Sequence, residues 1–170
     1  KKIRIENPKT ITFLIMPRCK SFITEFLQSS NIHTNLLIID FDNKDENIIL
    51  NNDFEYNKII NIISNNQNDL LLPIQYRCIE KLKRDFMEKS IVIISSNVNL
   101  AEYTKSRIPC EINVFIPSPK YYEMLIINII DDDNKKRFFN DYNNIVLSRN
   151  KYVIYTSLEV IREKIKHLFL

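Results

Sequence analysis

Hydrophobic positions along the chain fall into two patterns. Short continuous runs, rich in β-branched and aromatic residues, alternate with longer segments in which apolar residues recur every three or four positions. The continuous runs predict strands that are buried on both faces of a parallel sheet. These predicted strands are Thr10–Met16, Asn35–Asp40, Ile91–Ile94, Glu111–Ile116 and Tyr152–Tyr155.

The periodic segments predict amphipathic helices between these strands. Helices are expected from Ser21, over Asp53–Ser64, from Pro73 to about Lys89, over about Leu100–Ser106, from Ser118, over Lys135–Leu147 and from Thr156 to the last residue. Thr156 and Glu159 have capping-box spacing, and Pro119 suits a first helical turn. The run Asp131-Asp132-Asp133 is predicted to end the helix that begins at Ser118, although carboxylates at that end oppose the helix dipole.

The alternation of strands and helices predicts an α/β fold in which the sheet is mostly parallel and has about five strands. Helices are expected on both faces, which gives a three-layer sandwich. The chain has 170 residues and shows neither an internal repeat nor a linker, so residues 1–170 are predicted to form a single domain.

The segment Thr10–Leu27 carries the main chemical signal. A predicted strand, a short polar loop with Lys20-Ser21 and a helix follow one another, which is the layout of a phosphate-binding P-loop. The P-loop pattern G-x-x-x-x-G-K-[ST] places Leu14 and Cys19 where glycines are required. A Cβ atom at either position costs about 1–3 kcal/mol in strain or blocks the approach of phosphate.

Arg18, Lys20 and Ser21 remain candidates for phosphate binding, and the alternative is an ordinary exposed loop with a helix cap. Asp40 and Asp42 follow the second predicted strand at its carboxyl end, where ligands bind in open α/β sheets. They could hold Mg²⁺ or a substrate hydroxyl, although solvated residues in a turn are the favoured interpretation.

The absence of glycine changes how the P-loop pattern is weighed. The chain has 0 glycines, one alanine and many Ile, Asn, Lys, Tyr and Phe residues, a bias typical of an AT-rich genome such as that of a large virus, a phage or an AT-rich microbe. Drift of this kind can erode glycine motifs without selection against their function.

Charge and cysteine content add weaker constraints. The net charge of +3 does not by itself indicate a nucleic-acid-binding protein. Three separated cysteines form no zinc motif and fit reduced thiols. Without a long apolar run or a signal-peptide pattern, the sequence predicts a protein of the host-cell cytoplasm or a virion, neither secreted nor bound to a membrane.

Three segments resemble the small P-loop nucleotide kinases of phages and large viruses. Ile91–Ser96 is a strand that ends in Ser-Ser, and after a short helix Asn113–Pro117 ends a second strand in Pro. Phe138–Tyr142 and Tyr152–Ile161 are similar to the closing part of that family. The resemblance implies phosphoryl transfer from ATP to a nucleoside or deoxynucleoside monophosphate, with Mg²⁺, a glycine P-loop and lid arginines between the fourth and fifth strands.

The corresponding lid segment, Tyr121–Lys135, departs from this family. It carries apolar residues, Asn128 and three aspartates where the family has cations, and three carboxylates there would repel phosphate. Lys135, at the end of this segment, and Lys136 and Arg137 after it are near and could form a shifted lid.

The favoured hypothesis is therefore a catalytically degenerate nucleotide-kinase-like domain, kept as a binding or structural module with protein partners, for example in a viral or phage assembly. An active monophosphate kinase that uses ATP and Mg²⁺ is the first alternative. A nucleic-acid-associated protein that uses the basic face Lys81, Lys83 and Arg84 is the second.

Overall fold

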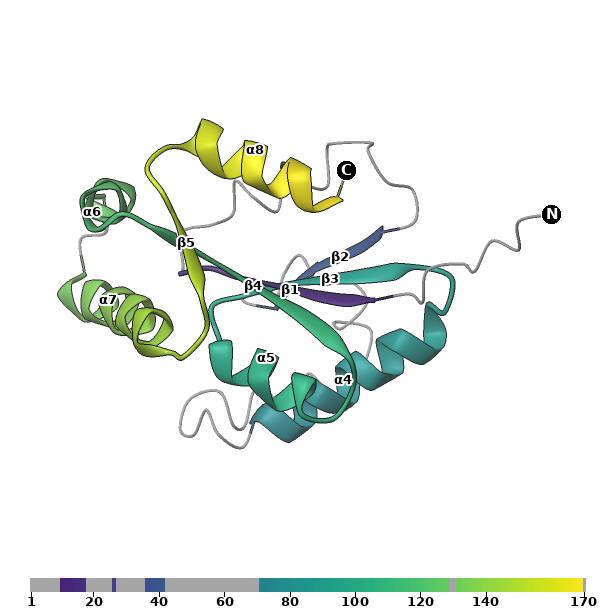
Figure 1. Ribbon diagram of the computed structural model, residues 1–170. Helices are drawn as coiled ribbons and strands as arrows, with labels where there is room; N and C mark the ends of the chain where they lie inside the picture. The colour runs from purple at the N-terminus through teal and green to yellow at the C-terminus, as the bar shows by residue number, and fades with distance from the viewer. Residues whose placement is uncertain (1–9, 18–25, 27–35, 42–70, 129–130, 170) are drawn as a thin grey trace.

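Five parallel strands form one sheet at the centre of the molecule, as a computed structural model shows (Figure 1). The structure describes residues 10–17, 26, 36–41, 71–128 and 131–169. The strands are β1 (Ile11–Ile15), β2 (Leu36–Asp40), β3 (Ser90–Ser95), β4 (Cys110–Pro117) and β5 (Tyr152–Tyr155). They lie in the order β2-β3-β1-β4-β5, and every neighbouring pair is parallel, which confirms the predicted sheet.

Helices cover both faces of this sheet. The described helices are α4 (Leu71–Asp85), α5 (Val98–Lys105), α6 (Pro119–Ile126), α7 (Asp132–Leu147) and α8 (Leu158–Phe169). In Figure 1, α8 lies above the sheet and α4 and α5 lie below it, so the predicted three-layer sandwich is confirmed. The helix predicted over Asp53–Ser64 lies outside the described residues, and of the helix predicted from Ser21 only Phe26 is described, as helical.

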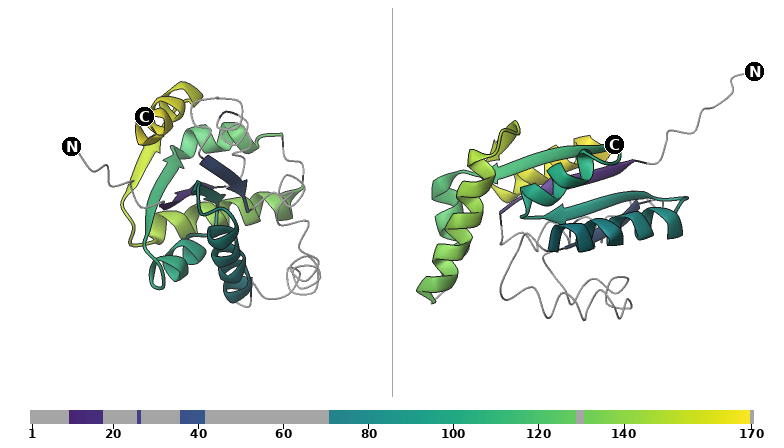
Figure 2. Two further views of the ribbon diagram at one scale, coloured as in Figure 1. Left: turned by 90° about the vertical axis from the view of Figure 1, so that its right-hand side faces the viewer. Right: turned by 90° about the horizontal axis from the view of Figure 1, so that it is seen from below.

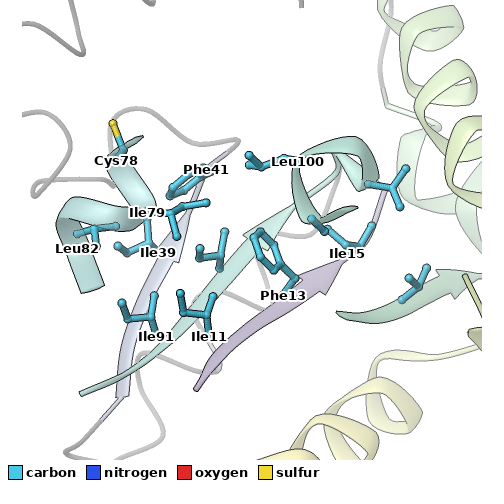
Figure 3. Close-up of a cluster of buried hydrophobic side chains, with 14 of the residues drawn as sticks. Ile11, Phe13, Ile15, Ile39, Phe41, Cys78, Ile79, Leu82, Ile91 and Leu100 are labelled. Atoms are coloured by element: carbon cyan, nitrogen blue, oxygen red, sulfur yellow. The ribbon is translucent and has the colours of Figure 1, made fainter. Parts of the chain in front are cut away.

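The central strand β1 shows why a continuous apolar run is needed. Successive side chains of a strand point to opposite faces, so Phe13 and Ile15 join the core under α4 and α5 (Figure 3), whereas Leu14 and Met16 join the core under α8. All four are fully buried. Strand β2, at one end of the strand order, also contributes to both cores, and its first three residues are half-buried.

Local capping moves two helix starts relative to the prediction. The side chain of Asn97 accepts hydrogen bonds from the backbone N–H groups of Asn99 and Leu100, so α5 begins at Val98. At α8, the hydroxyl of Ser157 accepts from the N–H of Val160. Ser157 is therefore the capping residue, and the prediction of a capping box at Thr156 is wrong by one position.

The aspartate run begins a helix and does not end one. Helix α6 stops at Ile126, and Asp131 caps α7 by accepting a hydrogen bond from the N–H of Asp133 at 2.9 Å. Asp132 and Asp133 occupy the first turn of α7, where carboxylates stabilise the positive end of the helix dipole. The unfavourable C-terminus expected from the sequence is thus wrong, because the acidic run belongs to the next helix.

Helices α6 and α7 connect β4 to β5 at the end of the sheet where the strands terminate, as the left side of Figure 1 and both views of Figure 2 show. The segment that the family resemblance identifies with a lid is therefore a helical pair beside the carboxyl edge of the sheet.

Candidate functional site

The carboxyl edge of the sheet is the candidate site, because ligands of parallel α/β proteins bind where the strands end. Strand β1 ends there between β3 and β4. Its pairing with β3 continues one residue further, since the N–H of Met16 donates to the carbonyl of Ser95 at 3.0 Å. Met16 and Pro17 are both buried. The backbone therefore leaves the sheet only after Met16.

This course of β1 conflicts with the requirements of a P-loop. Leu14, at the first glycine position of the pattern, is fully buried and lies in register with Ile94 of β3 and Asn113 of β4. Leu14 and Ile15 are thus strand backbone and not loop, and Met16 extends the pairing by one hydrogen bond. Pro17 follows and has no N–H to donate. Only two residues separate this rigid stretch from Lys20.

The predicted phosphate ligands Arg18, Lys20 and Ser21 lie outside the described residues, as does Cys19. The structure does show where the chain leaves the sheet before these residues, at the carboxyl end of the central strand β1. That position agrees with the order of elements in a P-loop protein. The residues before it, Leu14 to Pro17, are unfavourable for the loop geometry that glycines give a P-loop.

The end of β3 is occupied by a local hydrogen-bond network. The hydroxyl of Ser95 is almost fully buried and accepts a hydrogen bond from the N–H of Asn97 at 2.9 Å. Asn97 in turn caps α5. Both polar side chains therefore stabilise the turn from β3 to α5.

Asp40 is the last residue of β2 and lies beside Ile94 of β3. Its side chain is only 5% exposed, and it takes part in an interaction with another group of the protein. The favoured expectation of a solvated turn residue is therefore wrong for Asp40. Asp42 lies outside the described residues. Within the part of the chain that the structure describes, no group of three or more His, Cys, Asp or Glu residues could hold a metal ion.

Two tyrosines attach α6 and α7 to this edge. The hydroxyl of Tyr142, on α7, donates to the carbonyl of Pro117 at the end of β4 over 2.7 Å. The hydroxyl of Tyr122, on α6, donates to the carbonyl of Phe138 over 3.2 Å. The two rings stack with centroids 4.9 Å apart, and Tyr122 is almost fully buried. Helices α6 and α7 are thereby joined to each other and to β4.

The electrostatics of Tyr142 favour this arrangement. Burial raises the pKa of its hydroxyl, and the nearby Tyr152 raises it further. The group therefore stays protonated and remains a hydrogen-bond donor throughout the physiological pH range. Sequence analysis did not predict this bond. The available signal was a tyrosine at helical spacing with Phe138 and Ile145, whose hydroxyl needs a partner when the ring is buried.

Lys135, Lys136 and Arg137 lie in the first two turns of α7, separated from the three aspartates by Asn134. Lys135 is half-buried, and the other two are exposed. Consecutive residues of a helix point in directions about 100° apart. The three cations are therefore adjacent along α7, but their side chains do not all point toward one phosphate.

The remaining candidates lie on ordinary surfaces or in the core. Lys81, Lys83 and Arg84 are exposed on α4 beside Glu80 and Asp85, so that face carries both signs of charge. Tyr121 packs edge-to-face against Tyr155 at 5.9 Å. Tyr122 packs against the rings of Phe139 and Tyr142, so these aromatic residues of α6 and α7 contact each other.

Two of the three cysteines are described, and both are free thiols. Cys78 is buried in the core, and burial raises the pKa of the half-buried Cys110.

Comparison with protein-family models and with curated proteins finds no match for this chain. Among the described residues, no helix is both long enough and apolar enough to cross a membrane.

Proposed function

We propose that this protein is a catalytically degenerate nucleotide-kinase-like domain that serves as a binding or structural module. The observation that carries the proposal is the course of β1. Leu14 and Ile15 are paired within the sheet, and the N–H of Met16 is bonded to the carbonyl of Ser95, at positions where a P-loop has already begun.

A phosphate cradle depends on several backbone N–H groups that converge on one anion. The N–H of Met16 is already bonded to Ser95, and Pro17 has none. Glycine normally supplies the left-handed conformation that turns the remaining N–H groups inward, and this chain has no glycine at all. Lys20 and Ser21 alone would offer a point charge and a hydroxyl without the surrounding cradle.

The segment between β4 and β5 supports the same proposal. A kinase lid must close over the transferred phosphoryl group and place cations on it. Here the two helices of that segment are held to the sheet by Tyr142 and to each other by Tyr122. The start of α7 presents Asp131 as its cap and Asp132 and Asp133 in its first turn. A fixed, locally acidic segment is poorly suited to either task.

The test is a coupled assay of ATP consumption with nucleoside and deoxynucleoside monophosphates as acceptors. The proposal predicts that the wild-type protein and Lys20→Ala give the same background rate, while both show the same circular dichroism spectrum. Turnover that exceeds the background and disappears in Lys20→Ala would contradict the proposal and would establish the active-kinase alternative.

A further inference from the structure

The outer edge of the sheet at β5 is apolar on both faces. Tyr152, Val153 and Ile154 are 42%, 40% and 53% exposed, although each is a large hydrophobic side chain in a strand. No strand in the described part of the chain pairs with the outer side of β5. The left view of Figure 2 shows β5 at the margin of the sheet beside β4.

The elements on either side of β5 extend this apolar surface. Leu147, the last residue of α7, is 80% exposed, and Val160, in the first turn of α8, is 37% exposed. The β5 edge, which we define as Leu147, Tyr152–Ile154 and Val160, thus combines unpaired backbone groups with exposed apolar side chains.

Edge strands that remain in water usually carry protection against pairing, such as a charge, a proline or a bulge within the strand. The four residues of β5 include none of these, so within the strand its short length is its protection. A strand of β-branched and aromatic residues without a charge, proline or bulge is suited to pairing with another strand.

Charged residues before and after β5 indicate which partner fits. Arg149 and Lys151 precede the strand, and Glu159 lies four residues beyond it, in the first turn of α8. All three are exposed, and within the described residues none of them forms an ion pair. An antiparallel partner of the same sequence would bring the basic start of one strand beside the acidic end of the other, twice across a two-fold axis.

We propose that β5 pairs with β5 of a second copy of this chain, in antiparallel orientation, to form a symmetric dimer with one continuous sheet. The Val153 and Ile154 side chains would lie near the two-fold axis, and Arg149 and Lys151 of each copy would face Glu159 of the other. This interface is independent of the phosphate site, so the proposal stands or fails separately from the proposed function.

Sedimentation velocity over a concentration series tests this proposal. The wild-type protein is expected to be a dimer, and Ile154→Lys is expected to be a monomer with an unchanged circular dichroism spectrum. Met87→Lys is the control, because Met87 is 74% exposed at the end of α4 and far from β5 in sequence; this variant should remain a dimer. A wild-type monomer at every concentration, or a dimer that survives Ile154→Lys, would overturn the proposal.

A charge exchange tests the orientation of the two strands. Glu159→Lys alone should weaken dimerisation roughly three- to tenfold, since two exposed pairs are lost at once. The triple variant Arg149→Glu, Lys151→Glu, Glu159→Lys should restore the wild-type dissociation constant, because complementarity returns with both signs reversed. If the triple variant dimerises more weakly than Glu159→Lys, the antiparallel arrangement is wrong.

Discussion

Replacement of Tyr142 by phenylalanine tests whether α7 is fixed to the sheet as the structure indicates. The change removes one hydroxyl and keeps the ring that stacks on Tyr122. The lost interaction is the 2.7 Å hydrogen bond from that hydroxyl to the carbonyl of Pro117. Any change in stability therefore reports on the bond and not on ring packing.

The expected loss follows from the surroundings of this bond. A neutral hydrogen bond contributes about 1 kcal/mol net, and an acceptor left unpaired in a buried position raises the loss. Pro117 is buried and Tyr142 is half-buried, so we expect Tyr142→Phe to destabilise the protein by about 1–2 kcal/mol. For a domain of this size, the melting temperature should fall by roughly 2–8 °C.

The assay is thermal unfolding followed by circular dichroism, together with hydrogen exchange of the α6 and α7 amides. Tyr121→Phe is the matched control, because Tyr121 is half-buried in α6 and its hydroxyl forms no hydrogen bond with the described residues. The control should melt within a degree of the wild type. Equal melting temperatures for Tyr142→Phe and the wild type, with unchanged exchange in α7, would refute the attachment.

Two further predictions concern capping and pH. Asn97→Ala removes the acceptor for the N–H groups of Asn99 and Leu100, so chemical denaturation should show a free energy of unfolding that is lower by about 1 kcal/mol. Asn97→Asp keeps the acceptor and is the control. An equal loss in both variants would be contrary to this account. The raised pKa of Tyr142 favours its protonated form in the folded protein. The contribution of this hydroxyl to the free energy of unfolding is therefore fully present below the ordinary tyrosine pKa of about 10, and it is lost as pH rises through the folded-state pKa. The stability difference between wild type and Tyr142→Phe should therefore shrink in strongly alkaline solution, and a difference that grows there would show that the sign is wrong.

Hydrophobic periodicity was sufficient to predict the architecture of this chain. The run Ile91–Ile94 and the run that precedes Asp40 became adjacent parallel strands because continuous apolar segments can be buried only between two helical layers. The range Tyr152–Tyr155 was predicted with the bounds that the structure has. Its exposure was not predictable, because period and composition do not reveal which strand lies at an edge.

Polar residues near element ends were harder to assign. The aspartate run could end one helix or begin the next, and only the hydrogen bond from the N–H of Asp133 to Asp131 distinguishes these cases. Likewise, Thr156 and Ser157 are both suitable caps, and the choice depends on where the chain turns after β5. The burial of Asp40 depends on tertiary packing that a single sequence does not encode locally.

The candidate site was predictable in position but not in geometry. The order strand, Lys20-Ser21, helix placed it at the end of a strand, and the structure places that strand at the centre of the sheet. Whether Leu14 belonged to the loop or to the strand could not be read from its residue type. Its register with Ile94 and Asn113 decides the matter.

The most direct test of the central claim is thermal unfolding with and without millimolar Mg-ATP, on the wild type and on Lys20→Ala. A ligand at 100 times its Kd would stabilise the folded protein by about 2.7 kcal/mol, which raises the melting temperature of a domain of this size by roughly 5–10 °C. Because β1 occupies the positions that a phosphate cradle needs, we predict no shift for either protein. A shift of that size in the wild type, absent in Lys20→Ala, would contradict the proposal that the nucleotide site is degenerate.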